Sequence, residues 1–183
     1  MAKGKNIILG VSASIAIYKA CDIIRRGREQ GFSFDVVMTQ EAQELIRPVV
    51  FQSLSGNKVH TGMFDSADDW EIEHIALAKK ADAVLIAPAT ANIIAKLACG
   101  ICDDLLTCTV LSTKAPVLIA PAMNEAMYKN KITQENIKRL KGLGYKFVGP
   151  GEGKLACGDA GIGCLAKVEA ILREANKLFT DGD

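Results

Sequence analysis

The sequence predicts an α/β fold of the Rossmann-like or flavodoxin-like class, in which a doubly wound parallel sheet lies between two layers of helices. Two observations predict it. Apolar runs of strand length alternate along the chain with longer segments in which apolar residues recur at helical spacing. Two runs, 83–87 (AVLIA) and 117–120 (VLIA), are apolar throughout, which is typical of strands buried on both faces. With 183 residues, we expect a single domain over 1–183.

The first half of the chain opens with basic residues and the apolar run NIILGV. A signal peptide also begins in this way, but the run is short and leads into a Ser-rich turn, so we interpret it as the first strand. Gly31 ends the helical pattern that follows, and Pro48 ends a later one. The expected elements are strands over 6–11 and 33–38, helices over 14–30, 40–46, 49–54 and 71–80, and a polar loop over 56–70.

The second half contains the two continuously apolar strands and a glycine-rich segment. The segment 104–112 is rich in β-branched residues but also fits a buried helix, so both alternatives stay open. The other expected elements are strands over 83–87, 117–120 and 145–148, helices over 90–100, 133–143 and 167–179, and a loop over 149–163.

The charge and the apolar runs exclude several classes of protein. A net charge of +1 gives no electrostatic basis for binding nucleic acid or an acidic membrane. No apolar run approaches the roughly 20 residues that span a bilayer. Six cysteines in a long, apolar chain without an export signal indicate free thiols, so we expect a cytoplasmic protein.

Cys99 and Cys102 form a C-x-x-C motif, which a thiol-redox protein would use if it were accessible. The motif lies in a small-residue helical pattern, so we expect it to be buried. A zinc site would need further paired ligands, but the chain has only His60 and His74 as histidines, and we expect no metal.

Ligands of such folds bind beyond the carboxyl ends of the strands, so these ends carry the candidate functional residues. After the first strand, GVSAS (10–14) has small residues that allow a ligand to approach the backbone, and the following helix begins with free N–H groups that favour an anion. Simple capping by Ser12 or Ser14 is an equal alternative. After the second strand, Thr39 stands where dinucleotide folds place an acid for a ribose, and Asp35 lies at the opposite end. This favours a mononucleotide such as FMN.

Two apolar strands end in Pro-Ala and are each followed by an asparagine, in PATAN (88–92) and PAMN (121–124). Thr90 can cap the next helix, and Asn92 falls in its first turn, where asparagine is a poor helix former. Ordinary capping explains each motif alone. Their repetition at one edge of the sheet favours Asn124 as a ligand-binding residue.

His74 and Cys157 are the candidate reactive side chains. A histidine on an amphipathic helix is usually structural, but its pKa near 6.5 suits a base at neutral pH. Cys157 lies in GPGEGKLACGDAGIG (149–163), whose glycines suit a lid that covers substrate over about 149–164. A thiol in such a segment has no core to pack in, which favours a functional role.

Five segments together resemble the family of flavin-dependent cysteine decarboxylases, and within it the phosphopantothenoylcysteine decarboxylases. The segments are SASIAIYK (12–19), HIAL (74–77), PATAN (88–92), PAMNEAMY (121–128) and LACGD-x-G-x-G (155–163), and they span nearly the whole chain. The chain departs from the family's pattern at Ala13, where glycine is frequent, and at Cys164, where many bacterial relatives carry arginine.

The resemblance implies bound FMN, a Rossmann-like subunit and a homo-oligomer, either a trimer or a tetramer of trimers, with FMN between protomers. By position it implies that His74 is the catalytic base, Asn124 the ligand of the substrate carboxylate and Cys157 the proton donor. The implied FMN contacts are Ser12, Ala13, Ser14, Ile15, Thr39, Pro88, Ala89, Thr90, Asn92, Ala122 and Met123. The expected substrate contacts are Asn124, Leu155 and Ala156, with Lys154 as the candidate for the phosphate.

The implied activity is FMN-dependent decarboxylation of 4′-phosphopantothenoylcysteine to 4′-phosphopantetheine in coenzyme A biosynthesis. It proceeds through oxidation of the thiol to a thioaldehyde, loss of CO₂ and reduction by the reduced flavin. Family members are often fused to a downstream ligase, but this sequence ends at residue 183 without one, so we expect a stand-alone decarboxylase, with a trimmed fusion as the alternative. A separate phosphopantothenoylcysteine synthetase is the expected partner. The alternatives are a peptidyl-cysteine decarboxylase and a non-catalytic flavoprotein regulatory subunit; the PAMN and ACGD motifs argue against a flavin prenyltransferase.

Overall fold

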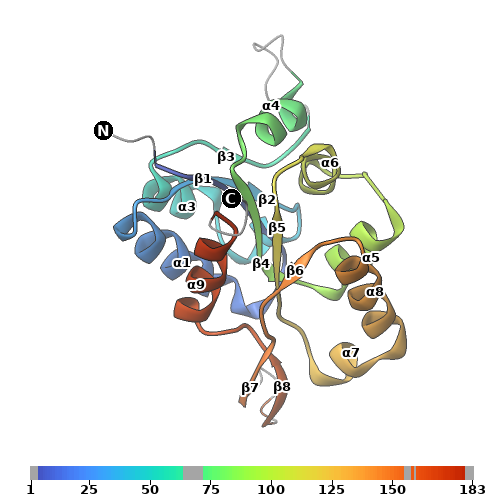
Figure 1. The fold of residues 1–183 in the computed structure, drawn as a ribbon. Coiled ribbons are helices and arrows are strands. Elements are labelled where there is room, and N and C mark those ends of the chain that lie inside the picture. The colour runs from blue at the N-terminus through green and yellow to red at the C-terminus, as the bar shows by residue number, and fades with distance from the viewer. Residues whose placement is uncertain (1–3, 64–71, 155–157, 159, 180–183) are drawn as a thin grey trace.

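Six parallel strands form the central sheet, in the order β3-β2-β1-β4-β5-β6 (Figure 1). The computed structural model describes residues 4–63, 72–154, 158 and 160–179. The order reverses between β1 and β4, which is the switch point where doubly wound folds bind ligands. The strands of this sheet are β1 (Asn6–Val11), β2 (Ser33–Met38), β3 (Val59–His60), β4 (Ala83–Ala89), β5 (Val117–Pro121) and β6 (Lys146–Phe147).

Helices cover both faces of the sheet and bury its apolar residues in two clusters. One cluster contains residues of α1 (Tyr18–Glu29), α3 (Pro48–Ser55) and α9 (Val168–Lys177), and the other of α5 (Ala91–Cys99), α6 (Leu105–Ser112) and α8 (Lys131–Gly142). The short elements are η1 (Ile15–Ile17), α2 (Ala42–Leu45), α4 (Glu73–Lys80) and α7 (Glu125–Lys129). The predicted three-layer α/β/α fold is therefore confirmed. None of the helices in the described part of the chain is both long and apolar enough to cross a membrane.

Several predicted elements need correction. The polar segment 56–70 contains the short strand β3, and 149–163 is not only loop, because β7 (Gly151–Lys154) and β8 (Ala160–Cys164) pair as an antiparallel hairpin. The strand β4 does not end before Pro88 but continues to Ala89, across a register shift. A proline is tolerated at such an irregularity because no regular ladder bond is lost there.

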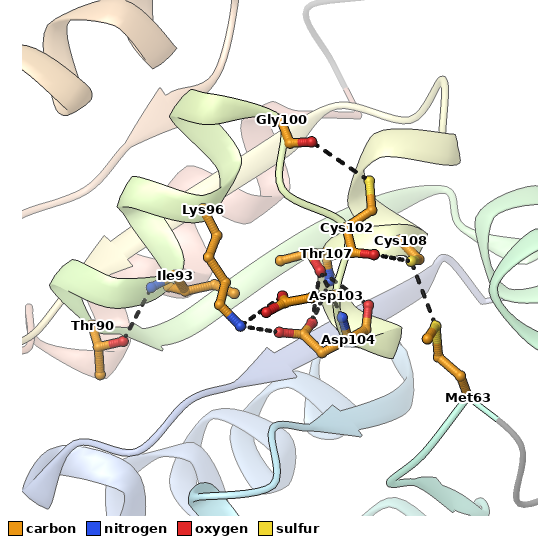
Figure 2. A network of polar contacts seen from close by, with 10 residues as sticks. All are labelled: Met63, Thr90, Ile93, Lys96, Gly100, Cys102, Asp103, Asp104, Thr107 and Cys108. Atoms are coloured by element: carbon orange, nitrogen blue, oxygen red, sulfur yellow. Dashed lines mark hydrogen bonds and ion pairs between the residues drawn. The ribbon is translucent and has the colours of Figure 1, made fainter.

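The ambiguous segment 104–112 forms the helix α6, and its capping residue explains why (Figure 2). The Asp104 carboxylate accepts a hydrogen bond from the Thr107 N–H at 2.8 Å, and Lys96 Nζ lies 2.9 Å from Asp104 Oδ2 and 2.7 Å from Asp103 Oδ1. Burial alone would raise the pKa of Asp104, but the Thr107 N–H and the Lys96 ammonium outweigh burial, and the pKa is lowered. This charged cap stabilises the start of α6.

Cys99 and Cys102 are both exposed, so the expectation that this C-x-x-C lies buried is wrong. Cys99 is the last residue of α5. Gly100, with a φ of 72°, then turns the chain out of the helix and leaves both thiols at the surface.

Gly10 is required for packing, which the sequence did not indicate. A Cβ at this position would lie 2.5 Å from Leu106 Cδ1, far closer than van der Waals contact allows. The glycine therefore permits α6 to approach β1, and the prediction that it permits a ligand to approach has no support at this residue.

Candidate active site at the carboxyl edge of the sheet

A cavity of about 590 Å³ lies at the carboxyl ends of the central strands. Segments distant in sequence line it: residues 13–16 and 18–19 after β1, Thr90 after β4, residues 122–124 and 127 after β5, and residues 163–165 in and after β8. Its volume is in the range of pockets that bind small molecules. The predicted residues Ala13, Ser14, Ile15, Thr90, Ala122, Met123 and Asn124 all lie in this lining.

Ser12 joins the ends of β1 and β4 instead of facing the cavity. Its hydroxyl donates to the Pro88 carbonyl at 2.8 Å and accepts from the Thr90 N–H at 3.0 Å. With only 2% of its surface exposed, the side chain is committed to these bonds. Ser12 thereby fixes where Thr90 stands, and Thr90 in turn caps α5 by accepting from Ile93 N–H.

Ser14 and the residues after it bring the amino end of η1 and α1 to the cavity. The Ser14 side chain accepts from the Ala16 N–H at 3.4 Å and caps this end, as one of the two alternatives expected. The amino end of a helix carries partial positive charge, so this wall of the cavity favours an anionic group.

Asn124 also lines the cavity and is the N-cap of α7. The preceding strand β5 is held at its end by the bond from Ala122 N–H to Ala89 O at 2.9 Å, so the two Pro-Ala motifs are adjacent. Asn124 Oδ1 accepts from the Ala126 N–H at 2.8 Å, which confirms the capping alternative. Asn124 is also exposed and lines the cavity, so capping does not exclude ligand binding.

The hairpin β7–β8 is bound to the segment that carries Asn124. Met123 N–H donates to Gly163 O at 3.0 Å, and the Glu125 carboxylate lies so close to Gly161 that a Cβ there would be 2.5 Å from Oε2. The Lys129 ammonium, 2.7 Å from Glu125 Oε1, and then the Ile162 N–H lower the pKa of Glu125. Lys129 therefore forms an ion pair with Glu125.

Other predicted residues do not line the cavity in the described part of the chain. They are Ser12, Thr39, Pro88, Ala89, Asn92 and His74. Thr39 is buried and accepts from Ala42 N–H at 3.3 Å, while Asn92 is exposed in the first turn of α5. Lys154 is the last residue of β7, and the predictions for Leu155, Ala156 and Cys157 fall outside the described residues.

His74 is half-buried in the first turn of α4, at the top of Figure 1, whereas β7 and β8 lie at the bottom. Its neighbour Glu73 is fixed by His60, whose Nδ1 lies 2.6 Å from Glu73 Oε1, and by Lys58 Nζ at 3.4 Å. These contacts join α4 to β3. The chain alone therefore does not place His74 beside Asn124.

The cavity also contains residues that the sequence did not single out, among them Lys19, Met127 and Leu165. Lys19 is one helical turn after Ile15, and this spacing alone could have identified it. It adds a cation to the wall that the amino end of α1 already makes favourable to anions.

Comparison with known proteins assigns the chain to a family. The model of the family described as Flavoprotein matches residues 1–180. The chain is 49% identical over 176 residues to the coenzyme A biosynthesis bifunctional protein CoaBC of Vibrio vulnificus, an alignment that covers 96% of this chain and 44% of that protein. The chain thus spans less than half the length of this relative.

Shorter relatives match along their whole length. A probable phosphopantothenoylcysteine decarboxylase of Streptococcus mutans is 45% identical, with 93% of this chain and 96% of that protein covered. Among solved structures, a cysteine-to-serine variant of PPC decarboxylase complexed with pantothenoylaminoethenethiol superposes with a TM-score of 0.85 at 27% identity, covering 97% of this chain and 99% of that chain. The FMN-dependent cysteine decarboxylase SpaF superposes with a TM-score of 0.80 at 32% identity, covering 94% and 98%. The resemblance drawn from the five sequence segments is confirmed, and the chain belongs to the flavoprotein family.

Proposed function

We propose that this chain binds FMN and decarboxylates 4′-phosphopantothenoylcysteine to 4′-phosphopantetheine, a step of coenzyme A biosynthesis. The observation that carries the proposal is the position of Asn124, which projects from the end of β5 into a cavity that the amino end of α1 also lines. Two relatives named for this activity or pathway, at 45% and 49% identity, support it.

The residues of the cavity fit a flavin mononucleotide. Ala13, Ile15, Ala122 and Met123 provide an apolar surface for a flat ring system, and the amino end of α1 suits a phosphate. The carboxylate of Asp35 is buried at the other end of β2, where it binds Asn6 and Lys80. Thr39 and Gln40 directly follow β2, so the two positions just after this strand carry no carboxylate for the ribose of a dinucleotide, which favours a mononucleotide.

In the proposed reaction, bound FMN supplies the two-electron oxidation and reduction that decarboxylation of a cysteine requires. The Asn124 amide binds the carboxylate that leaves as CO₂. Its Oδ1 accepts from the Ala126 N–H, so the atom that would bind a carboxylate oxygen is the NH₂ nitrogen, which is a donor. A neutral donor orients the carboxylate without the full charge that would oppose its loss.

We assign proton transfer to His74 and Cys157. His74 serves as the base during oxidation of the substrate, and Cys157 protonates the product. The hairpin β7–β8 leads to Cys157 and covers the substrate. Lys19 is a partner for the substrate phosphate in addition to Lys154, because Lys19 lines the cavity.

The proposed assembly is a homo-oligomer built from trimers, in which His74 of one protomer completes the cavity of another. Two observations support it. His74 does not line the cavity of its own chain, as far as the structure describes it, and the large apolar side chains of Ile15 and Tyr18 are 63% and 60% exposed at the cavity. A neighbouring protomer would cover them. The five cysteines among the described residues are free thiols, which supports a cytoplasmic location.

The test is to incubate the purified protein with 4′-phosphopantothenoylcysteine and to detect 4′-phosphopantetheine by mass spectrometry. We expect a yellow protein with a flavin spectrum and catalytic formation of the product. A peptide with a C-terminal cysteine is the matched second substrate, because SpaF, at 32% identity, is a cysteine decarboxylase. Turnover of the peptide alone would identify a peptidyl-cysteine decarboxylase, and a colourless protein that cannot be reconstituted with FMN contradicts the proposal as a whole.

A further inference from the structure

Three sulfur-containing residues from separate segments are in contact beside the start of α6 (Figure 2). Met63 follows β3, Cys102 lies between α5 and α6, and Cys108 is in α6. Cys108 Sγ lies 3.6 Å from Met63 Sδ and 3.5 Å from the Cys102 carbonyl oxygen. None of the three residues lines the cavity described above. The cluster therefore lies outside this cavity.

The spacing of the sulfur atoms suits a shared metal ion. Metal–sulfur bonds of about 2.3 Å at tetrahedral angles separate two sulfur ligands by roughly 3.8 Å, close to the Cys108–Met63 distance of 3.6 Å. Cys102 contacts Cys108 Sγ through its carbonyl oxygen, and its thiol would have to turn to bind a shared ion. The Cys102 thiol makes only a weak contact, at 3.9 Å, with the Gly100 carbonyl, and this exposed side chain can turn about one bond.

The type of ligand selects the type of metal. Thiolate and thioether ligands select soft ions, above all Cu(I), whereas Mg²⁺ and Ca²⁺ require oxygen. The thioether of Met63 distinguishes this cluster from an ordinary zinc site, whose ligands are cysteine, histidine and carboxylate. The adjacent Asp103 and Asp104 carboxylates outnumber the Lys96 ammonium that they bind, so the surroundings attract a cation.

Binding would form two bonds between the metal ion and the cysteine sulfur atoms. The two thiol protons would be released to solvent.

We propose that Met63, Cys102 and Cys108 form a binding site for one soft metal ion of the Cu(I) class. The bound ion would connect the segment after β3 to α6 and the α5–α6 loop. The proposal does not depend on the proposed decarboxylase activity, because the readout is metal binding.

The experiment titrates the reduced protein with Cu(I) without oxygen, in competition with the coloured chelator bathocuproine disulfonate. We expect one tightly bound ion per chain, with only sulfur neighbours at about 2.3 Å in X-ray absorption. Cys102→Ser and Cys108→Ser each remove a direct ligand of the metal, so each should weaken Cu(I) binding by more than roughly 100-fold. Loss of a residue that only hydrogen-bonds to a ligand costs up to about that factor. Met63→Leu, which conserves volume, should weaken it as well.

Cys99→Ser and Cys21→Ser are the matched controls, since both remove a free thiol outside the cluster. They should leave the affinity unchanged. Loss of binding in Cys99→Ser but not in Cys108→Ser would assign the metal to the C-x-x-C motif and overturn the proposal. An unchanged affinity for Cu(I) in Met63→Leu would contradict the proposal that the Met63 thioether is a ligand. This test holds even if one of the serine variants folds poorly.

Discussion

Asn124 Oδ1 accepts a hydrogen bond from the Ala126 N–H at 2.8 Å, and the same side chain lines the cavity. The bond fixes which end of the amide is engaged with α7. The capping role and the proposed carboxylate-binding role therefore use different atoms of one side chain and can be separated by substitution.

Asn124→Asp should abolish substrate binding while leaving the fold intact. Aspartate caps a helix as well as asparagine does, but it replaces the NH₂ donor by a charged oxygen. We expect substrate affinity to fall by about 100-fold or more, because like charges at a binding site cost several kcal/mol. The measurement is equilibrium binding of the substrate and, separately, of 4′-phosphopantetheine, which lacks the carboxylate and should bind normally.

Asn130→Asp is the matched control for this substitution. Asn130 caps α8 in the same way, by accepting from Ile132 N–H at 2.9 Å, but it does not line the cavity. Asn130→Asp should change neither the affinity for the substrate nor the affinity for 4′-phosphopantetheine. Equal loss of substrate and product binding in Asn124→Asp would mean that the residue shapes the cavity without binding the carboxylate.

Cys157→Ser should release CO₂ without forming 4′-phosphopantetheine. A serine hydroxyl is a far weaker acid than a thiol, so the final protonation should fail after the carboxylate has left. Stopped-flow absorbance would follow the flavin, and mass spectrometry the product. Cys99→Ser, an exposed thiol away from the cavity, should behave as the parent protein. Normal turnover of Cys157→Ser would remove this residue from the mechanism.

Ser12→Ala should destabilise the protein and weaken flavin binding together. The substitution leaves the Thr90 N–H without its side-chain partner at the edge of the cavity, which costs about 1–3 kcal/mol when the group is buried. Urea unfolding with and without FMN measures both effects. Ser53→Ala removes an exposed hydroxyl that donates to Val49 O, and it should change stability by less than about 0.5 kcal/mol. Equal effects of the two substitutions would contradict the role of Ser12.

Asp104→Asn should reduce the loss of stability in acid. The pKa of Asp104 is lower in the folded chain than in the unfolded chain, so its ionised form stabilises the fold above the unfolded pKa of about 3.9. That stability is lost as the pH falls through the lower, folded value. Asparagine keeps the cap but not the charge. The free energy of unfolding should therefore fall less steeply between pH 7 and pH 2 than in the parent protein.

Much of the fold could be predicted because its determinants are local. The apolar runs of β4 and β5 identify strands that are buried on both faces, and Gly31 marks where α1 must stop. The hairpin β7–β8 could not be predicted in this way. Its strands are rich in glycine, and their pairing depends on backbone bonds and on contact with the 123–125 segment, which no local pattern encodes.

The candidate site could be predicted to the level of its strand ends but not of its individual contacts. Ser14 and Asn124 do line the cavity. Ser12, two residues from Ser14 in the same motif, is instead used to join two strands, because its hydroxyl meets Pro88 and Thr90 from a segment 76 to 78 residues away. Likewise, only the packed structure shows that Gly10 leaves space for the side chain of Leu106.

The attachment of β8 has a consequence for how the proposed enzyme would work. Met123 is bound to Gly163, and Glu125 contacts Gly161, so the residues on both sides of Asn124 are held by one strand. A displacement of that strand is transmitted to Asn124 through two anchor points. Movement of β8 away from the cavity would then also displace Asn124 from the substrate carboxylate. Entry of the substrate and orientation of its carboxylate would therefore be coupled.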